Sequence, residues 1–158
     1  MELLPCFEWI EATSIGNAIR RSLWLFPVIE AIHLLGLCVL GGAVLIVDLR
    51  MLGVGLRGYP IPQIARDARP WFLGALAVML ATGSALFTSE AVKCYYNTSF
   101  WVKITTLPFA VMLTIGIRDP MALRASLDAT PSTRAVGMTS IALWVIVAAA
   151  GRWIGFSG

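Results

Sequence analysis

The sequence contains one histidine, His33, and it lies in a long apolar run. Glu30 precedes it by three residues, so the two side chains should project from one side of a helix. Lys103 lies about one turn inside another apolar run. Ionisable side chains are costly inside a membrane-spanning helix, which makes these three residues candidates for a function. They fall in the same half of the membrane, where their side chains could converge on one site.

The chemistry that suits such a site is haem binding. A neutral imidazole in an apolar helix bundle is a good axial ligand for haem iron. Haem is a large apolar plate with two carboxylates at one edge, and Arg or Lys near the membrane surface can bind them. We therefore expect a haem b site with His33 on the iron, and the other candidates around it are Glu30, Lys103, Arg20, Arg21 and Arg152. The second axial position would hold water, a Met, Lys103, nothing, or His33 of another chain.

A purely structural interpretation uses the same residues. Glu30 and His33 could form a hydrogen-bonded pair that only fixes helix packing. Lys103 could extend to the membrane surface or pair with Glu30. Other chemistries have weaker support, because one histidine and scattered cysteines form no closed metal site of ordinary spacing. The sequence also shows no nucleophile beside a base, no phosphate-binding glycine loop and no pattern for nucleic-acid binding.

The elements that must position these residues are membrane-spanning helices. Hydrophobic residues make up 58% of the 158 residues and charged residues only 13%, with a mean hydropathy of +0.81. A soluble domain carries about twice that share of charge, so lipid must cover most of this surface. We predict an all-α integral membrane four-helix bundle as a single domain, residues 1–158. The predicted spans are residues 23–49, 71–88, 100–117 and 136–154.

The segments between the spans are expected to be short. Residues 3–20 alternate apolar and polar side chains, which predicts short amphipathic turns lying on the membrane. Residues 50–70 are rich in Gly and Pro and should form a loop. Asp119 and Pro120 are expected to begin a short surface helix over residues 121–129. Asp48, which is followed by Arg50, is interpreted as an anchor of the first span at the membrane interface.

The basic residues predict an orientation. The first and third loops hold seven of them, whereas the opposite face holds four. The positive-inside rule then places the two Arg-rich loops in the cytoplasm and both termini outside, in a bacterial inner membrane. The loop residues counted are Arg50, Arg57, Arg66, Arg69, Arg118, Arg124 and Arg134, and those of the opposite face are Arg20, Arg21, Lys93 and Arg152.

The three cysteines are interpreted in the light of this orientation. Cys38 lies deep in the first span and should be a small apolar filler. Cys6 and Cys94 both fall on the outer face, where an oxidising compartment would allow a disulfide. The alternative is that they are two unrelated thiols.

Two segments resemble a known family. Residues 26–36 and 47–53 are similar to the hallmark of a family of uncharacterised bacterial four-helix membrane proteins, Glu-Ala-x-His-Leu-x-Gly followed by Asp-Leu-Arg-x-Leu-Gly. Residues 100–103 resemble the start of that family's third helix. The family is distantly similar to the HemJ-type protoporphyrinogen oxidases and the CopD-type copper-resistance proteins. In the HemJ type an early-helix histidine is tied to haem, and His33 and Lys103 occupy matching places.

The resemblance also has limits. The chain lacks any other histidine, which argues against porphyrinogen oxidation, and it lacks the Met and His clusters of a copper carrier. We therefore expect a haem-b membrane protein that transfers electrons or oxidises a lipid-soluble substrate. The alternative is a non-catalytic accessory subunit of a larger membrane complex, favoured by the small residues Gly36, Gly41 and Gly42. A homo-oligomer is compatible with either, and membrane lipid is the surrounding partner in both.

Overall fold

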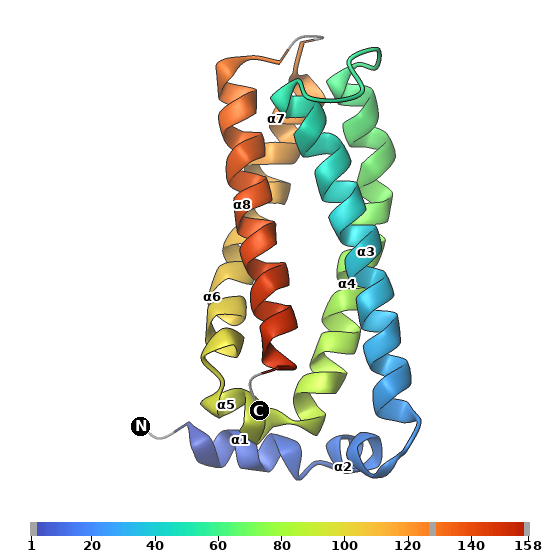
Figure 1. Cartoon of the computed structure of the whole chain (residues 1–158), viewed down its shortest axis with the longest axis vertical. Helices are drawn as coiled ribbons and strands as arrows, with labels where there is room; N and C mark the ends of the chain where they lie inside the picture. Colours follow the sequence, from blue (N-terminus) through green and yellow to red (C-terminus); the bar gives the residue numbers. More distant parts are fainter. Residues whose placement is uncertain (1–2, 127–128, 157–158) are drawn as a thin grey trace.

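The computed structural model describes residues 3–126 and 129–156, and every element in that part of the chain is helical (Figure 1). This confirms the predicted all-α class. The elements in chain order are α1 (Leu4–Glu11), α2 (Ser14–Arg21), α3 (Leu25–Leu52), α4 (Ile61–Ser89), α5 (Ala91–Tyr96), α6 (Thr98–Leu113), the π-helix η1 (Thr114–Arg118), α7 (Asp119–Arg124) and α8 (Pro131–Ile154).

Four helical stretches of the described chain are long and apolar enough to cross a membrane. They are α3, α4, the continuous run Thr98–Arg124 formed by α6, η1 and α7, and α8, and each contains an 18-residue stretch with a mean hydropathy between 1.6 and 2.3. Large apolar side chains point away from the bundle, including Leu35, Trp71 and Met112, which are 65–68% exposed. Lipid is the solvent that makes this surface stable, so the chain is a multi-pass integral membrane protein.

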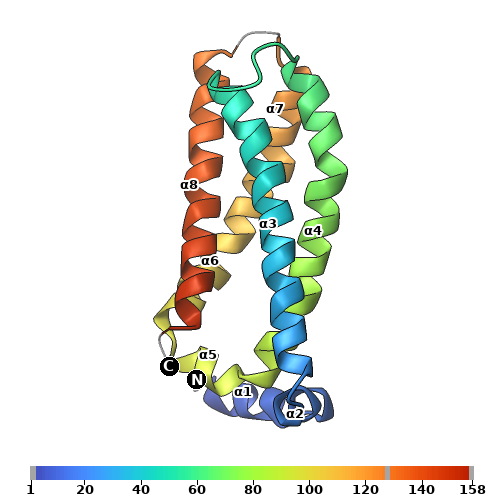
Figure 2. The ribbon, with the colours of Figure 1, turned by 45° about the vertical axis from the view of Figure 1, so that its right-hand side comes forward.

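The two N-terminal helices lie across one end of the bundle (Figures 1 and 2). This confirms the predicted amphipathic segment, because α2 buries Gly16 and Ile19 and exposes its basic last turn. A Cβ at Gly16 would lie 2.4 Å from the carbonyl oxygen of Thr88, so α2 packs directly on the end of α4. Glu11 accepts a hydrogen bond from the Val92 backbone nitrogen at 2.7 Å, which joins α1 to α5. We call this the terminal end, and the opposite end, where α3 ends and α4 begins, the loop end.

The bundle is packed unevenly along its length. One buried cluster surrounds Phe72 and Trp144, and a second, nearer the loop end, surrounds Val47, Met51 and Ile61. Toward the terminal end the packing opens. We define the terminal half as residues 25–35 of α3, 77–88 of α4, 101–109 of α6 and 151–154 of α8, and none of these residues is buried. The loop half is residues 36–52 of α3, 61–76 of α4, 110–124 of α6, η1 and α7, and 131–150 of α8, and it contains both clusters.

Helix boundaries differ most from the predictions at the start of the second long helix and after the third, and the last long helix also begins five residues early, at Pro131. The second long helix begins at Ile61, ten residues before the predicted span, because Pro62 sits in its first turn, where no backbone N–H is needed. The short helix predicted over residues 121–129 is present as α7, but it spans Asp119–Arg124 and is not a separate surface helix. The helix instead continues from α6 into α7, which ends at Arg124 and buries Ala122 completely. The π-helix lets the helix continue past Pro120. The backbone N–H of Asp119, the residue before the proline, bonds to the carbonyl oxygen of Thr114.

Candidate functional site

His33 lies on the inward side of α3 and is held by α4. Its Nδ1 is 2.7 Å from Oγ1 of Thr82, and the Thr82 hydroxyl also donates to the carbonyl oxygen of Val78 at 2.6 Å. A hydroxyl has one proton, so Thr82 must accept from His33, and Nδ1 must carry the hydrogen. Nε2 therefore holds the lone pair, and it has no hydrogen-bond partner in the described part of the chain.

Glu30 does not meet His33. Its side chain is exposed and makes no hydrogen bond or ion pair to any described residue. The two positions are three residues apart and so about 60° apart around the helix. That angle is enough to place His33 at the edge of the α3–α4 contact and Glu30 outside it. The interpretation of a Glu30–His33 hydrogen-bonded pair is therefore wrong, and Thr82 takes the role of orienting the imidazole.

Lys103 enters the bundle from α6. It is half-buried and close enough for its charge to act on His33. A Cβ at Gly151 of α8 would lie 3.3 Å from Lys103 Nζ, so the amine rests against that glycine. On the other side, a Cβ at Gly83 of α4 would lie 3.2 Å from His33 Cε1. The structure thus brings His33 and Lys103 together in the terminal half, with a glycine beside each.

The other predicted cations lie at the terminal end but do not surround His33. Arg20 is paired with Glu11 and donates to the Asn17 side chain at 2.8 Å. Arg21 is exposed at the end of α2. The guanidinium of Arg152 lies 4.3 Å from the ring centre of Phe156, near the end of α8. These residues border the site from the membrane surface, and only Lys103 reaches into it.

The cysteines are all free thiols in the structure. Cys6 is exposed on α1, Cys38 is exposed on α3, and Cys94 is buried in α5. The disulfide expected between Cys6 and Cys94 is therefore not formed here. Burial, followed by the nearby carboxylate of Glu90, raises the pKa of the Cys94 thiol to about 11. A thiol with that pKa is a poor nucleophile at neutral pH.

A second group of ionisable residues lies in the loop half, and sequence reasoning missed it. Asp48 of α3 and Arg118 of η1 are 0% and 2% exposed, and Asp119 is 7% exposed. Arg118 Nε lies 2.9 Å from Asp48 Oδ1, and Arg118 Nη1 donates to Asp119 Oδ1 at 2.7 Å. The interpretation of Asp48 as an interface anchor is wrong. The rule applied to His33 would have found it, since Asp48 also falls inside a predicted span.

Aromatic side chains close the inner side of this group. The Arg118 guanidinium lies 6.0 Å from the ring centre of Phe72, within reach of a cation–π interaction. Phe72 meets Trp144 edge to face, with 5.8 Å between ring centres. Trp144 Nε1 donates to Thr114 Oγ1 at 2.9 Å, and Thr114 is fully buried. The hydrophobic cluster around Phe72 therefore separates this group from His33.

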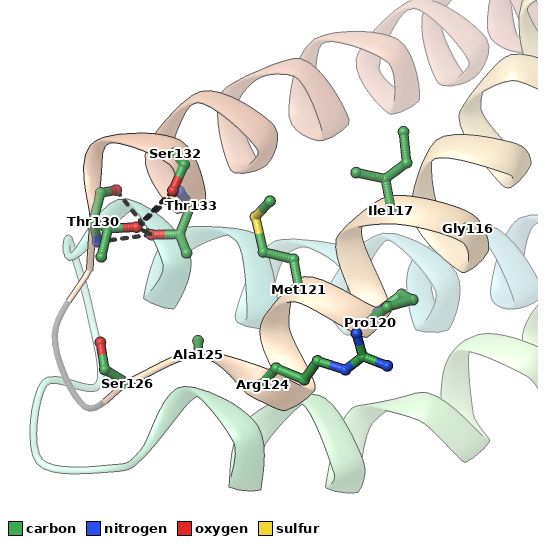
Figure 3. Close-up of a pocket in the computed structure, with 10 residues that line it drawn as sticks. All are labelled: Gly116, Ile117, Pro120, Met121, Arg124, Ala125, Ser126, Thr130, Ser132 and Thr133. Atoms are coloured by element: carbon green, nitrogen blue, oxygen red, sulfur yellow. Dashed lines mark hydrogen bonds between the residues drawn. The ribbon is translucent and has the colours of Figure 1, made fainter.

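A cavity of about 510 Å³ lies at the loop end between α7 and the start of α8 (Figure 3). Arg124 and Ser126 line it on one side, and on the other side lies the cap of α8, where Thr130 accepts from the Thr133 backbone nitrogen at 3.2 Å and Ser132 bonds to Thr130 at 2.9 Å. These donors are used within the cap, as the dashed lines of Figure 3 show. The lining residues contain no acid or histidine, and within the described residues no three His, Cys, Asp or Glu side chains form a metal cluster.

Comparison with known proteins identifies the family but no function. No curated protein and no solved structure matches the chain, so the distant similarity to the HemJ and CopD types stays a prediction. The sequence does match one family across residues 6–157, which includes all four long helices and His33, Asp48 and Lys103. The chain belongs to that family, which is described as a family of unknown function (DUF6644).

Proposed function

We propose that this membrane protein binds haem b with His33 as the iron ligand, and that it serves electron transfer or the oxidation of a lipid-soluble substrate. The observation that carries the proposal is the protonation state of the imidazole. Because Nδ1–H is donated to Thr82, Nε2 keeps its lone pair for a metal. A hydrogen bond from the other ring nitrogen is the usual support of a metal-bound histidine. Bound haem would supply one-electron chemistry.

The surroundings of His33 support the same proposal. The inward positions of the terminal half are only half-buried, in contrast to the filled loop half. Gly83 and Gly151 keep two helix surfaces free of side chains beside His33 and Lys103. Lys103 could serve as second axial ligand or as a cation for a haem carboxylate. Arg21 and Arg152, exposed at the terminal end, could meet the carboxylates near the membrane surface.

The test is the optical spectrum of protein purified in mild detergent from haem-replete cells. We expect a Soret band, with haem b identified by pyridine haemochrome and mass spectrometry. The substitution His33→Ala should abolish the band. Glu30→Gln on the same helix is the matched control and should retain it, because Glu30 is exposed and makes no hydrogen bond to His33. A folded but colourless wild-type protein would contradict the proposal.

A second candidate function is that of an accessory subunit, and one surface feature favours it. A groove of about 700 Å³ runs along the outer face of α3 and α4 and is almost wholly apolar. Small residues in such a groove let another helix approach closely. The lining residues are Ile32, Leu35, Gly36, Val39, Pro70, Trp71, Gly74, Ala75 and Val78.

Copurification separates this candidate from the first. A subunit should retain a stoichiometric membrane partner in mild detergent. Gly74→Leu should release that partner by filling the groove, since a Cβ at Gly74 meets no other atom within 4 Å and the fold can accept it. Gly116→Leu, at an equally open glycine that does not line the groove, is the control. A chain that stays alone in detergent, with or without these changes, would exclude the accessory role.

A further inference from the structure

We infer that the buried group of Asp48, Arg118 and Asp119 is a proton-binding site, in which the two carboxylates together hold one proton and Asp48 is its carrier. This site is distinct from the one proposed at His33. Asp48 and His33 are 15 residues apart on α3, which is about 22 Å along a helix. The buried cluster of Leu40, Val44 and Phe72 fills the space between them.

The charges in this group do not balance. Asp48 and Asp119 would both be negative if ionised, and Arg118 is the single cation whose charge acts on Asp48. The uncharged groups beside Asp48 and Arg118 include Ser140 of α8 and Phe72 of α4. Arg50 of α3 is also buried, but its Nε donates to the carbonyl oxygen of Tyr59 at 2.8 Å, and it is not among the groups whose charge acts on Asp48. The site would therefore carry one excess negative charge at 0–7% exposure. An unpaired charge in such surroundings is strongly unfavourable, and binding a proton removes it.

The hydrogen bonds distinguish the two carboxylates. Asp119 accepts a well-formed bond from Arg118 Nη1 at 2.7 Å, which stabilises its ionised form. Neither oxygen of Asp48 makes a hydrogen bond of normal geometry, although Arg118 Nε is 2.9 Å away. Asp48 is also the more buried of the two, with no exposed surface. The proton should therefore reside on Asp48.

Ser140 makes either state of Asp48 acceptable. Its hydroxyl is fully buried, lies near the Asp48 carboxyl group, and makes no hydrogen bond of normal geometry in the described chain. A hydroxyl can donate to a carboxylate or accept from a carboxylic acid by rotating its hydrogen. The site therefore has a partner for Asp48 before and after protonation, which a fixed donor would not provide.

The backbone explains why this group is buried and why it lies near the loop end. A Cβ at Gly137 would lie 3.2 Å from the Asp48 carbonyl oxygen, so α3 and α8 are in close contact here. The π-helix directs two successive residues, Arg118 and Asp119, into the bundle. Asp48 lies four residues before the end of α3, about 6 Å from the loop end. A proton that enters from that side does not cross the cluster around Phe72, although the buried side chains of Val47, Met51 and Ile61 pack at that end.

Infrared spectroscopy of the full chain in lipid membranes tests the inference. At neutral pH the wild-type protein should show the stretching band of a protonated carboxyl group, and Asp48→Asn should remove it. Asp119→Asn should move the titration of this band to lower pH, because the excess negative charge is gone. Glu30→Gln is the matched control for a carboxyl group facing lipid and should leave the Asp48 band in place.

The inference is overturned if the wild-type protein shows no such band at neutral pH, or if the band survives Asp48→Asn. Should Asp48→Asn fail to fold, Ser140→Ala provides a second test. Removing the hydroxyl must shift the frequency of the Asp48 band, and an unchanged frequency would count against the proposed partner. None of these readouts depends on haem, so the two proposals can fail independently.

Discussion

The two halves of the bundle contain the same pair of hydrogen bonds in different surroundings. In the loop half, Trp144 donates to Thr114, whose hydroxyl donates to the carbonyl of Ala110 at 2.7 Å. In the terminal half, His33 donates to Thr82, whose hydroxyl donates to the carbonyl one turn before it in the same way. The indole has no further polar atom, whereas the imidazole keeps a lone pair. One arrangement can only join helices, and the other can also bind a ligand.

Side-chain packing also differs between the loop half and the terminal half. In the loop half the apolar side chains form two buried clusters, and Arg118 has two carboxylate partners. In the terminal half no residue is buried, and Lys103 makes no ion pair to any described residue. Sites of ligand binding are commonly drawn from the less stable part of a fold. We therefore expect the loop half to supply most of the stability and the terminal half to supply the ligand-binding site.

The largest effect should come from removing a cation in each half. Arg118→Gln leaves Asp48 and Asp119 without their buried partner and should cost about 3–5 kcal/mol of unfolding free energy. Lys103→Gln removes a half-buried cation that has no ion pair and should cost less than about 1 kcal/mol. Reversible unfolding in mixed micelles measures both. Equal losses would show that the two halves do not differ in stability as proposed.

The two threonines offer a finer comparison with near-isosteric changes. Thr114→Val leaves the buried Trp144 N–H without an acceptor and should cost about 1–3 kcal/mol. Thr82→Val should cost less, because His33 is half-buried and other partners can reach it. Its main effect should be on the ring, which would lose its fixed tautomer. Nitrogen NMR of the imidazole measures that, and an unchanged tautomer would remove the assigned role of Thr82.

The sequence predicted the number of long helices well because the apolar runs report directly on lipid exposure. It placed His33 and Lys103 in one half of the membrane, since depth follows from residue count along a helix. The sequence did not predict contacts that depend on how a helix is rotated about its own axis. Glu30 is only about 60° from His33, and spacing alone cannot say which of the two faces α4.

The Asp48 group was missed for a different reason. Its partners, Arg118 and Asp119, lie 70 and 71 residues further along the chain, and both were placed outside the predicted spans, in the third loop and at the start of a surface helix. The sequence Asp119-Pro120 suggested the start of a new helix. In the structure the π-helix at Thr114–Arg118 continues into α7 without a break, and the side chains of Arg118 and Asp119 point into the bundle. A single sequence contains no local signal for that turn. The nearby Arg50 also offered Asp48 a plausible neighbour close in sequence.

Alanine substitutions at two glycines of α4 should differ by a smaller amount in their effect on the free energy of unfolding. Gly74→Ala meets no atom within 4 Å and should stabilise the helix by about 0.5–1 kcal/mol. Gly83→Ala would place its Cβ 3.2 Å from His33 Cε1, so the imidazole must shift and most of that gain should be lost. Unfolding experiments measure the difference. A full gain at Gly83 would mean that the imidazole moves freely, which contradicts its fixed position against Thr82.

The last prediction concerns thiol labelling, which leaves stability unchanged and shows which end of the bundle faces the outside of the membrane. A membrane-impermeant maleimide applied to intact spheroplasts should modify exposed Cys6 if the terminal end faces outward, as the distribution of arginines predicts. Cys94 should react slowly from either side, because burial raises the pKa of its thiol to about 11 and little thiolate exists at neutral pH. Raising the pH toward that value should speed its reaction, provided the protein stays folded.

The matched control places a thiol at the other end of the bundle. In a variant with Cys6, Cys38 and Cys94 replaced by Ala, Gln63→Cys presents an exposed thiol in the first turn of α4, at the loop end. It should react only after the membrane is opened, if the loop end is cytoplasmic. The reverse pattern, with Gln63→Cys labelled from outside and Cys6 protected, would invert the predicted topology. The proton site at Asp48 would then open to the outside and His33 would lie in the inner half, because the fold ties each site to one end.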